Sequence, residues 1–309
     1  MNRDALGRVV AVANSKGGVG KTSLVTTLAG LAAVAGYKVL VVDLDPQGNV
    51  GEDLGYTGRG EGDGGSGLVA SIAAGTALTV ALPGVRQNID VACSGDRLED
   101  LSGLLLSRGR REQDDLADTL AGPLAQLLTA QDYDLVLIDC PPGESVLQIL
   151  ALGAARWLVI PTRGDAASLK GMGRIAQRLV RARSHNPSVE LLGVVLFDIA
   201  ASATRLRREI AQQITEALGG IAPLFEATIR HSIAATDARG RGLLIHEHAA
   251  ALEGEPFWQA LREGRRPVSP GSAPALAGDY AALAHEVLLR IATIEAQTAA
   301  ANEVTAWVG

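Results

Sequence analysis

Residues 14–23 read Asn-Ser-Lys-Gly-Gly-Val-Gly-Lys-Thr-Ser, and they directly follow a short β-rich apolar run, residues 8–13 (Arg-Val-Val-Ala-Val-Ala). The glycines of this stretch let the backbone turn so that successive N–H groups point inward at phosphate oxygens. From Thr22 to about Ala35 apolar residues recur at helical spacing, so the positive end of a helix faces the same anion. A strand, a glycine loop and a helix in this order predict a nucleotide-binding α/β fold.

The two residues after the last glycine complete a phosphate-binding loop, or P-loop. Lys21 places a cation on the β- and γ-phosphates, and the Thr22 hydroxyl can ligate Mg²⁺. A glycine-rich turn alone is a weak signal, but here the strand, the Lys-Thr pair and the helix all match. We therefore expect ATP and Mg²⁺ as cofactors, and we expect the nucleotide to contact Lys16, Gly17, Gly18, Val19, Gly20, Lys21, Thr22 and Ser23.

Acidic residues stand at the ends of two apolar runs. Asp43 and Asp45 lie in the segment Asp-Leu-Asp-Pro-Gln, and Asp139 begins the segment Asp-Cys-Pro-Pro-Gly. An α/β sheet binds its ligand beyond the carboxyl ends of its strands, so Asp139 is the natural Walker-B acid. Asp43 and Thr22 would complete the metal site, and Asp45 can orient the attacking water. For a single acid, a role as helix cap or turn residue would be the better interpretation, but three acids at the right strand ends favour the site.

Lys16 is a second lysine, at the start of the loop, which an ordinary P-loop does not need. One interpretation is a solvated surface lysine. The other is a cation that reaches the nucleotide of a neighbouring subunit and supplies charge during phosphoryl transfer, as an arginine finger does. The surrounding sequence favours the second interpretation, so we expect Lys16, Lys21 and Asp45 to be the catalytic residues.

The composition limits the classes of function. The chain has 309 residues, 47% of them hydrophobic and 20% charged, which is ordinary for a globular protein. Its net charge of -6 excludes a whole-molecule positive field, so nucleic acid would need a local basic patch. Two cysteines, Cys93 and Cys140, are too few for a disulfide scaffold and are expected to be buried and reduced. Without a signal peptide or an apolar span, we expect a cytoplasmic protein.

Apolar runs alternate with helical patterns along the chain. This order predicts an α/β fold, a mainly parallel twisted sheet with helices on both faces, as one domain over residues 1–309. Two stretches interrupt it: a glycine-rich segment, 58–67, expected to be a mobile loop without regular structure, and a Pro/Gly-rich exposed insertion, 263–278. The expected strands are 38–43, 89–92, 135–139, 157–160 and 191–197, and the expected helices lie near 114–130, 166–183, 203–218 and 279–297.

Three motifs are specific to a known family. Residues 16–23, 43–49 (Asp-Leu-Asp-Pro-Gln-Gly-Asn) and 133–142 (Tyr-Asp-Leu-Val-Leu-Ile-Asp-Cys-Pro-Pro) resemble the ParA/MinD family of P-loop ATPases, closest to short, Soj-like ParA proteins. The resemblance continues through 193–198 (Gly-Val-Val-Leu-Phe-Asp) to Tyr280 and beyond, so it covers most of the chain apart from the two insertions.

This resemblance implies an ATPase that forms an ATP-dependent sandwich homodimer. Lys16 would reach the partner's phosphates, Asp45 would be needed for hydrolysis, and Phe197 and Asp198 would contact the nucleotide. Such dimers bind DNA without sequence preference, associate with the nucleoid, and release DNA when a ParB-like or other activating partner stimulates hydrolysis. The cycle positions plasmids, chromosomes or other cargo.

The sequence lacks arginines at two places where members of this family tend to carry DNA-facing ones. Residues 198–204 read Asp-Ile-Ala-Ala-Ser-Ala-Thr, and residues 232–234 read Ser-Ile-Ala. Other basic residues recur at helical spacing and could replace them, although a solvated helix face explains each stripe equally well. The candidates for DNA contact are Lys170, Arg174, Arg178 and Arg181 on one helix, and Arg205 and Arg208 on another.

One other function stays open beside DNA partition, and two further functions fit the sequence less well. A ParA-like ATPase that positions a protein complex would not need strong DNA binding. A MinD-like membrane-surface regulator would need a basic amphipathic C-terminal helix, but residues 298–309 contain no Lys or Arg, and no membrane partner is expected. An electron carrier like the nitrogenase iron protein would need cluster cysteines, and Cys140 lies inside the Walker-B segment.

Overall fold

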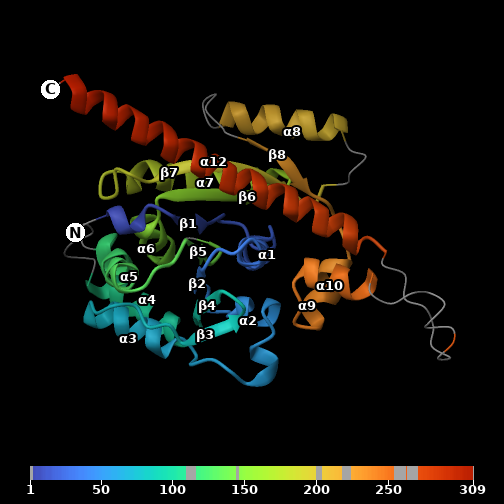
Figure 1. The fold of residues 1–309 in the computed structure, drawn as a ribbon, viewed down its shortest axis with the longest axis horizontal. Coiled ribbons are helices and arrows are strands. Elements are labelled where there is room, and N and C mark those ends of the chain that lie inside the picture. Colours follow the sequence, from blue (N-terminus) through green and yellow to red (C-terminus); the bar gives the residue numbers. More distant parts are fainter. Residues whose placement is uncertain are drawn as a thin grey trace.

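A computed structural model describes residues 3–108, 116–143, 146–199, 204–217, 224–253, 262 and 271–308. Its centre is an eight-stranded sheet in the order β3-β4-β2-β5-β1-β6-β7-β8, parallel except that β3 runs antiparallel to β4 (Figure 1). The strands are β1 (Val9–Val12), β2 (Val39–Asp43), β3 (Leu82–Arg86), β4 (Ile89–Ala92), β5 (Leu135–Asp139), β6 (Trp157–Thr162), β7 (Glu190–Phe197) and β8 (Leu224–Ile229).

Helices cover both faces of this sheet. Alternate strand residues point to opposite faces, so Val9 and Ala11 of β1 join one core, while Val10 and Val12 join the other. The first core packs against α3 (Ser66–Ala74), α4 (Arg97–Arg108), α5 (Asp118–Ala130), α6 (Val146–Ala154), α7 (Ala166–Ala182) and α8 (Thr204–Ala217). The second packs against α1 (Lys21–Val34), α2 (Asn49–Asp53), α9 (Ala234–Gly240), α10 (Ile245–Glu253) and α12 (Ala273–Val308).

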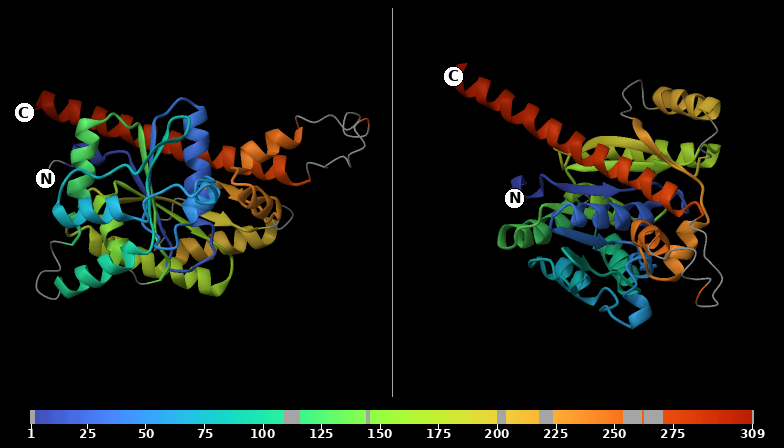
Figure 2. Two further views of the ribbon diagram at one scale, coloured as in Figure 1. Left: turned by 90° about the horizontal axis from the view of Figure 1, so that it is seen from below. Right: turned by 45° about the vertical axis from the view of Figure 1, so that its right-hand side comes forward.

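The last helix, α12, lies on the second face over β7 and β8 and beside α1, α9 and α10. Its buried side chains Tyr280, Leu283, Val287 and Ile291 recur at helical spacing and contact α1, α10 and β8. Figures 1 and 2 show that its C-terminal end projects beyond the body of the protein. No helix in the described ranges combines the length and the apolar character needed to cross a lipid bilayer.

The predicted fold class is confirmed, and the predicted strands 89–92 and 135–139 have the observed bounds. The prediction for 58–67 is wrong at both ends, because a 3₁₀ helix spans Thr57–Arg59 and α3 begins at Ser66. Asp63 accepts hydrogen bonds from the amides of Gly65 and Gly67 and so organises the start of α3. A short polar side chain that bonds the backbone compensates here for the flexibility of glycine.

The exposed insertion predicted at 263–278 is also partly wrong. Its last residues form the first turns of α12, where Ala273 and Leu276 are buried in the second core. Residues 263–270 lie outside the described part of the chain. The helix therefore begins six residues before the closing helix expected at 279–297.

Candidate nucleotide-binding site

The glycine loop leaves the carboxyl end of β1 and leads into α1. Gly18 and Gly20 have φ values of 70° and 84°, a region that L side chains rarely adopt, and Gly20 is the N-cap of α1. A Cβ on Gly20 would collide with the ring of Phe197 at the end of β7, whereas one on Gly18 would meet open space. Phe197 therefore packs against the last turn of the loop, and its contact with a nucleotide stays a prediction.

Lys21 and Thr22 begin α1 and lie next to Asp139. Lys21 is buried, and its Nζ donates to the Lys16 carbonyl oxygen at 3.3 Å. Burial lowers the pKa of Lys21, against the opposing effect of the Asp139 charge. The Thr22 hydroxyl donates to Asp139 Oδ2 at 2.7 Å. The structure thus joins the P-loop threonine directly to the acid at the end of β5.

Two buried carboxylates face each other at the ends of adjacent strands. Asp43 and Asp139 are register partners of β2 and β5, and both are fully buried. Burial raises the pKa of both groups, that of Asp139 to about 7. Within the described part of the chain, Asp43 Oδ2 and Asp139 Oδ1 make no hydrogen bond. Because buried charged oxygens normally have partners, this pair fits a hydrated divalent cation.

A cage of protein ligands around a metal is absent from the described residues, where no group of three or more His, Cys, Asp or Glu side chains converges on one point. Mg²⁺ commonly keeps several waters and takes only one or two carboxylates together with phosphate oxygens. The residues present therefore fit a cation that arrives with a nucleotide, next to the Thr22 hydroxyl.

Asp45 is held in place by hydrogen bonds to residues on either side of it and to Ser94. Its amide donates to Asp43 Oδ1 at 2.9 Å, and its carboxylate accepts from the Gln47 amide at 3.1 Å. The Ser94 hydroxyl donates to the Asp45 carbonyl oxygen. The turn after β2 is thereby tied to the same strand end as Asp43, so the acids predicted from sequence lie together.

Lys16 does not project freely into solvent. Its Nζ lies 2.6 Å from Asp165 Oδ1, and its side chain is 32% exposed. Asp165 is the N-cap of α7 and accepts hydrogen bonds from the Ser168 amide and hydroxyl. Hydrogen bonds from Lys16 and then Ser168 hold the pKa of Asp165 below its usual range. Contact of Lys16 with a second subunit stays a prediction.

Sequence reasoning missed three residues around the loop. Asn14 donates to the Pro161 carbonyl oxygen at 2.8 Å and accepts from the Lys16 amide at 3.0 Å, so it fixes the loop entrance against β6. Arg163 lies 3.1 Å from Asp198, and His231 bonds the other oxygen of that carboxylate. Asp198 has a φ of 63°, which is uncommon for a non-glycine residue. The only signal in the sequence was their position after apolar strands.

The basic stripes predicted for DNA contact are not equivalent. Lys170, Arg174 and Arg181 are exposed on α7. Arg178 is directed differently from the prediction, because it donates to the Gly143 carbonyl oxygen at 3.2 Å and to the Gln148 side chain. Arg178 therefore stabilises the segment that follows Asp139.

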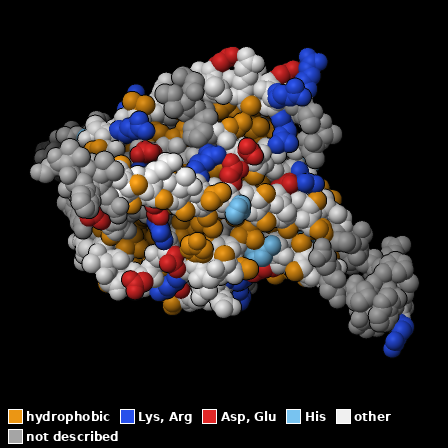
Figure 3. Space-filling model, turned by 45° about the horizontal axis from the view of Figure 1, so that its top comes forward, with side chains coloured by type: hydrophobic (Ala, Val, Ile, Leu, Met, Phe, Trp, Pro, Cys, Tyr) orange, Lys and Arg blue, Asp and Glu red, His pale blue; other side chains and the backbone are white. Residues whose placement is uncertain are grey.

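On α8, Arg205 and Arg208 are both exposed, and Arg205 lies 2.8 Å from Glu209. On the face shown in Figure 3, Lys and Arg side chains are scattered among acidic ones and do not form one continuous basic surface. The two stripes therefore remain separate candidates for DNA contact.

The sequence of the chain is similar to those of several known proteins. Residues 7–191 match a family described as an AAA domain. The chromosome-partitioning ATPase Soj of Thermus thermophilus is 32% identical over 266 residues, which cover 83% of this chain and 94% of that protein. The chromosome partitioning protein ParA of Caulobacter vibrioides is 31% identical over 253 residues, which cover 78% of this chain and 87% of that protein.

Solved structures share the fold. A variant of McdA from Cyanothece, in complex with ATP, superposes with a TM-score of 0.63 at 22% identity, covering 85% of this chain and 98% of that one. Cobyrinic acid a,c-diamide synthase of Mycobacterium smegmatis with ADP and magnesium gives a TM-score of 0.60 at 26% identity, covering 85% and 99%. Both were solved with a nucleotide, the second also with the metal.

Proposed function

The chain belongs to the family of P-loop partitioning ATPases that includes Soj and ParA, and from this membership we propose that it hydrolyses ATP to position DNA. The observation that carries the proposal is the hydrogen bond between Thr22 and Asp139, beside two buried carboxylate oxygens that have no partner among the described residues. A P-loop threonine joined to such an acid is the arrangement expected for a Mg²⁺-nucleotide.

The P-loop residues bind and orient the phosphates. The amides from Gly17 to Thr22 surround them, and Lys21, already buried at the start of α1, neutralises the β- and γ-phosphates. Phosphoryl transfer needs mainly positioning and charge stabilisation, so a rigid loop provides most of the catalysis. Ser23, Phe197 and Asp198 complete the contacts that we propose for the nucleotide.

The acidic residues have two proposed roles, which are to hold Mg²⁺ and to orient the attacking water. Asp43, Asp139 and Thr22 are the residues that would hold Mg²⁺, which would neutralise phosphate charge when bound. Asp45 sits on a turn fixed by Asp43 and by Gln47, close to where a water would attack, and it orients that water. Hydrolysis then yields ADP and phosphate.

The proposed working form is an ATP-dependent homodimer in the cytoplasm, nucleoid-associated when it binds DNA. Lys16 leaves Asp165 and adds a positive charge at the partner subunit's nucleotide. Nonspecific DNA would bind the basic stripe of α7, and a ParB-like or other activating partner would stimulate hydrolysis and release. A second candidate function is positioning of a protein complex, which is favoured by the scattered basic side chains and by the inward contacts of Arg178.

Sedimentation distinguishes these functions. The protein is centrifuged with ATP, ADP or no nucleotide, against nonspecific duplex DNA and against anionic liposomes, using Asp45→Ala to slow hydrolysis. ATP-dependent pelleting with DNA supports partition, and ATP binding without DNA pelleting supports the protein-cargo function. Pelleting with liposomes instead would contradict both, and Lys21→Ala serves as the control that should not respond to ATP.

A further inference from the structure

An ion pair between half-buried Arg239 and buried Asp53 connects α9 to α2. Asp53, the last residue of α2, is only 5% exposed. Its Oδ1 accepts from Arg239 Nε, and its Oδ2 accepts from the Thr26 hydroxyl of α1 at 2.9 Å. Both carboxylate oxygens are therefore occupied, as a charge removed from water requires. Three helices, α1, α2 and α9, meet at this one carboxylate.

The same guanidinium also reaches the nucleotide loop. Arg239 Nη2 donates to the Ser23 hydroxyl at 3.1 Å, two residues after Lys21. Thr26 Oγ1, which donates to Asp53, also lies 3.0 Å from the Thr22 carbonyl oxygen. The planar guanidinium of arginine presents separate N–H groups in a fixed geometry, here one to a carboxylate and one to a hydroxyl. Arg239 therefore sets the orientation of the Ser23 hydroxyl.

The helix that Asp53 ends is the direct continuation of the catalytic turn. The Gly48 amide donates to the Asp45 carbonyl oxygen at 2.9 Å, and α2 begins at the next residue. Beyond α2, Gly55 lies against Gly242, where a Cβ on Gly242 would be 2.7 Å from the Gly55 Cα. The segment from Asp45 to Gly55 is thus fixed at one end by β2 and at the other by the α9 region.

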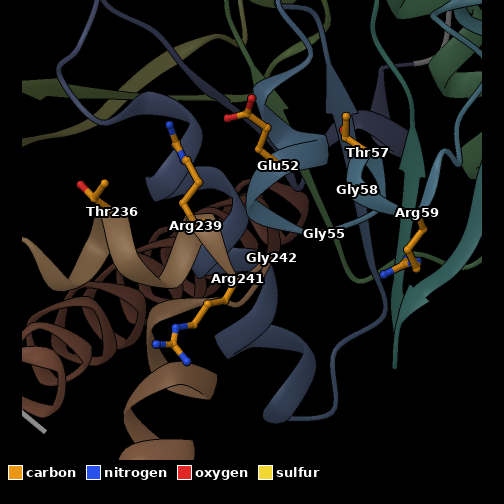
Figure 4. A pocket seen from close by; sticks show the side chains of 10 residues that line it. Glu52, Gly55, Thr57, Gly58, Arg59, Thr236, Arg239, Arg241 and Gly242 are labelled. Atoms are coloured by element: carbon orange, nitrogen blue, oxygen red, sulfur yellow. The ribbon is translucent and has the colours of Figure 1, made fainter. Parts of the chain in front are cut away.

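Arg241 lines the same cleft as Arg239 but has a different partner. A cleft of about 700 Å³ lies beside the contact between Gly55 and Gly242. It is lined by Glu52, Gly55, Thr57, Gly58, Arg59, Thr236, Arg239, Gly240, Arg241 and Gly242. In Figure 4 Arg239 and Arg241 leave the backbone in different directions. Arg241 lies 3.4 Å from Asp237 on its own helix. Arg241 therefore offers a matched control from the same cleft.

We infer that Arg239 is a positioning residue of the nucleotide site. It directs the Ser23 hydroxyl toward the nucleotide and, through Asp53, holds α2 and the turn that carries Asp45. This inference rests on the proposed function, because it assumes that a nucleotide occupies the P-loop.

The test is a double-mutant cycle on the dissociation constant of a fluorescent ATP analogue, with Arg239→Met, Ser23→Ala and the double variant. Loss of one oriented hydrogen bond corresponds to roughly a fivefold change in affinity. We expect Arg239→Met to weaken binding about fivefold in the wild-type background, and less than about twofold once Ser23 is alanine. Equal factors in the two backgrounds would overturn the assignment, and Arg241→Met should leave the affinity unchanged.

A second readout needs no nucleotide. Hydrogen exchange at the α2 amides should be several-fold faster in Arg239→Met than in wild type. Unchanged exchange rates would contradict the claim that Arg239 stabilises α2 through Asp53. If Arg239→Met does not fold, the double variant with Asp53→Asn removes the unpaired charge of the Asp53 carboxylate. This double variant still lacks the donor to Ser23. Wild-type protein that binds no ATP analogue contradicts the proposed function, whereas wild type and Arg239→Met binding equally contradicts this inference alone.

Discussion

Lys16 Nζ lies 2.6 Å from Asp165 Oδ1, which pairs the lysine at the start of the P-loop with the residue that caps α7. The two partners come from β1 and β6 connections that are 149 residues apart in sequence. If Lys16 acts on a second subunit, this pair must break first. In that case the ion pair would compete with dimer formation.

The first prediction is that Asp165→Asn promotes ATP-dependent dimerisation. Asparagine caps a helix about as well as aspartate, so α7 keeps its start while the charge on Lys16 is released. A partly exposed ion pair contributes up to about 1 kcal/mol, so the dimer dissociation constant should fall about two- to fivefold. Analytical ultracentrifugation with ATP measures this. An unchanged constant would mean that the pair does not compete, and Lys16→Ala, the control, should not dimerise.

The second prediction concerns pH and the buried acids. Burial raises the pKa of Asp139 to about 7, so its charged form is less stable in the folded than in the unfolded chain. The folded state therefore binds more protons between about pH 7 and the usual pKa of aspartate, and nucleotide-free protein gains stability as the pH falls through this window. Asp139→Asn should raise Tm at pH 8 by at least about 2 °C and by less at pH 5.5.

Thermal melting at the two pH values measures this effect. Asp96→Asn, at an exposed position, is the matched control and should leave both Tm values unchanged. An Asp139→Asn protein that melts below wild type at pH 8 would show that the carboxylate stabilises the nucleotide-free fold.

The third prediction separates two glycines of the loop. Gly18 and Gly20 both have positive φ, so alanine strains either position by about 1 kcal/mol or more. Only at Gly20 does the new Cβ also meet the Phe197 ring. Gly20→Ala should therefore lower the stability of the nucleotide-free protein by at least about 1 kcal/mol more than Gly18→Ala. Denaturant unfolding compares the two variants. Equal losses in the free energy of unfolding would show that the Phe197 ring does not pack against the loop.

The fourth prediction concerns the two basic stripes. The α7 sequence contains no acidic residue, whereas Arg205 of α8 is paired with Glu209. Lys170→Ala with Arg174→Ala should weaken ATP-dependent DNA binding and reduce the log–log salt slope by about two. Arg205→Ala with Arg208→Ala, the matched pair on α8, should have a smaller effect. A larger effect of the α8 pair would move the DNA surface to that helix.

Much of the fold could be predicted because its central strands are buried on both faces. The run 135–139 is buried along its whole length and 89–92 is apolar apart from Asp90, and the predicted bounds of both are correct. Strand β3 was missed because Pro83 and Gly84 argue against a strand, and an edge position tolerates both. The start of α3 was missed because Asp63 supplies hydrogen bonds that a count of glycines does not reveal.

Local motifs revealed the site, but its distant contacts could not be predicted. The P-loop and the acids after β2 and β5 carry their own spacing rules, so sequence was enough to group them. The partners of Lys16 and Asp53 lie 149 and 186 residues away along the chain. No periodicity links such positions, since only the order of strands in the sheet brings them together.

The position of α12 has a consequence for the order of folding. This last helix covers the face of α1 with Tyr280, Leu283 and Val287, so the helix that begins at the P-loop obtains its final neighbours only when the end of the chain has been made. Translation at about 5–20 residues per second leaves an interval on the order of tens of seconds between α1 and α12. During that interval the apolar side of α1 is a surface that nascent-chain chaperones can hold.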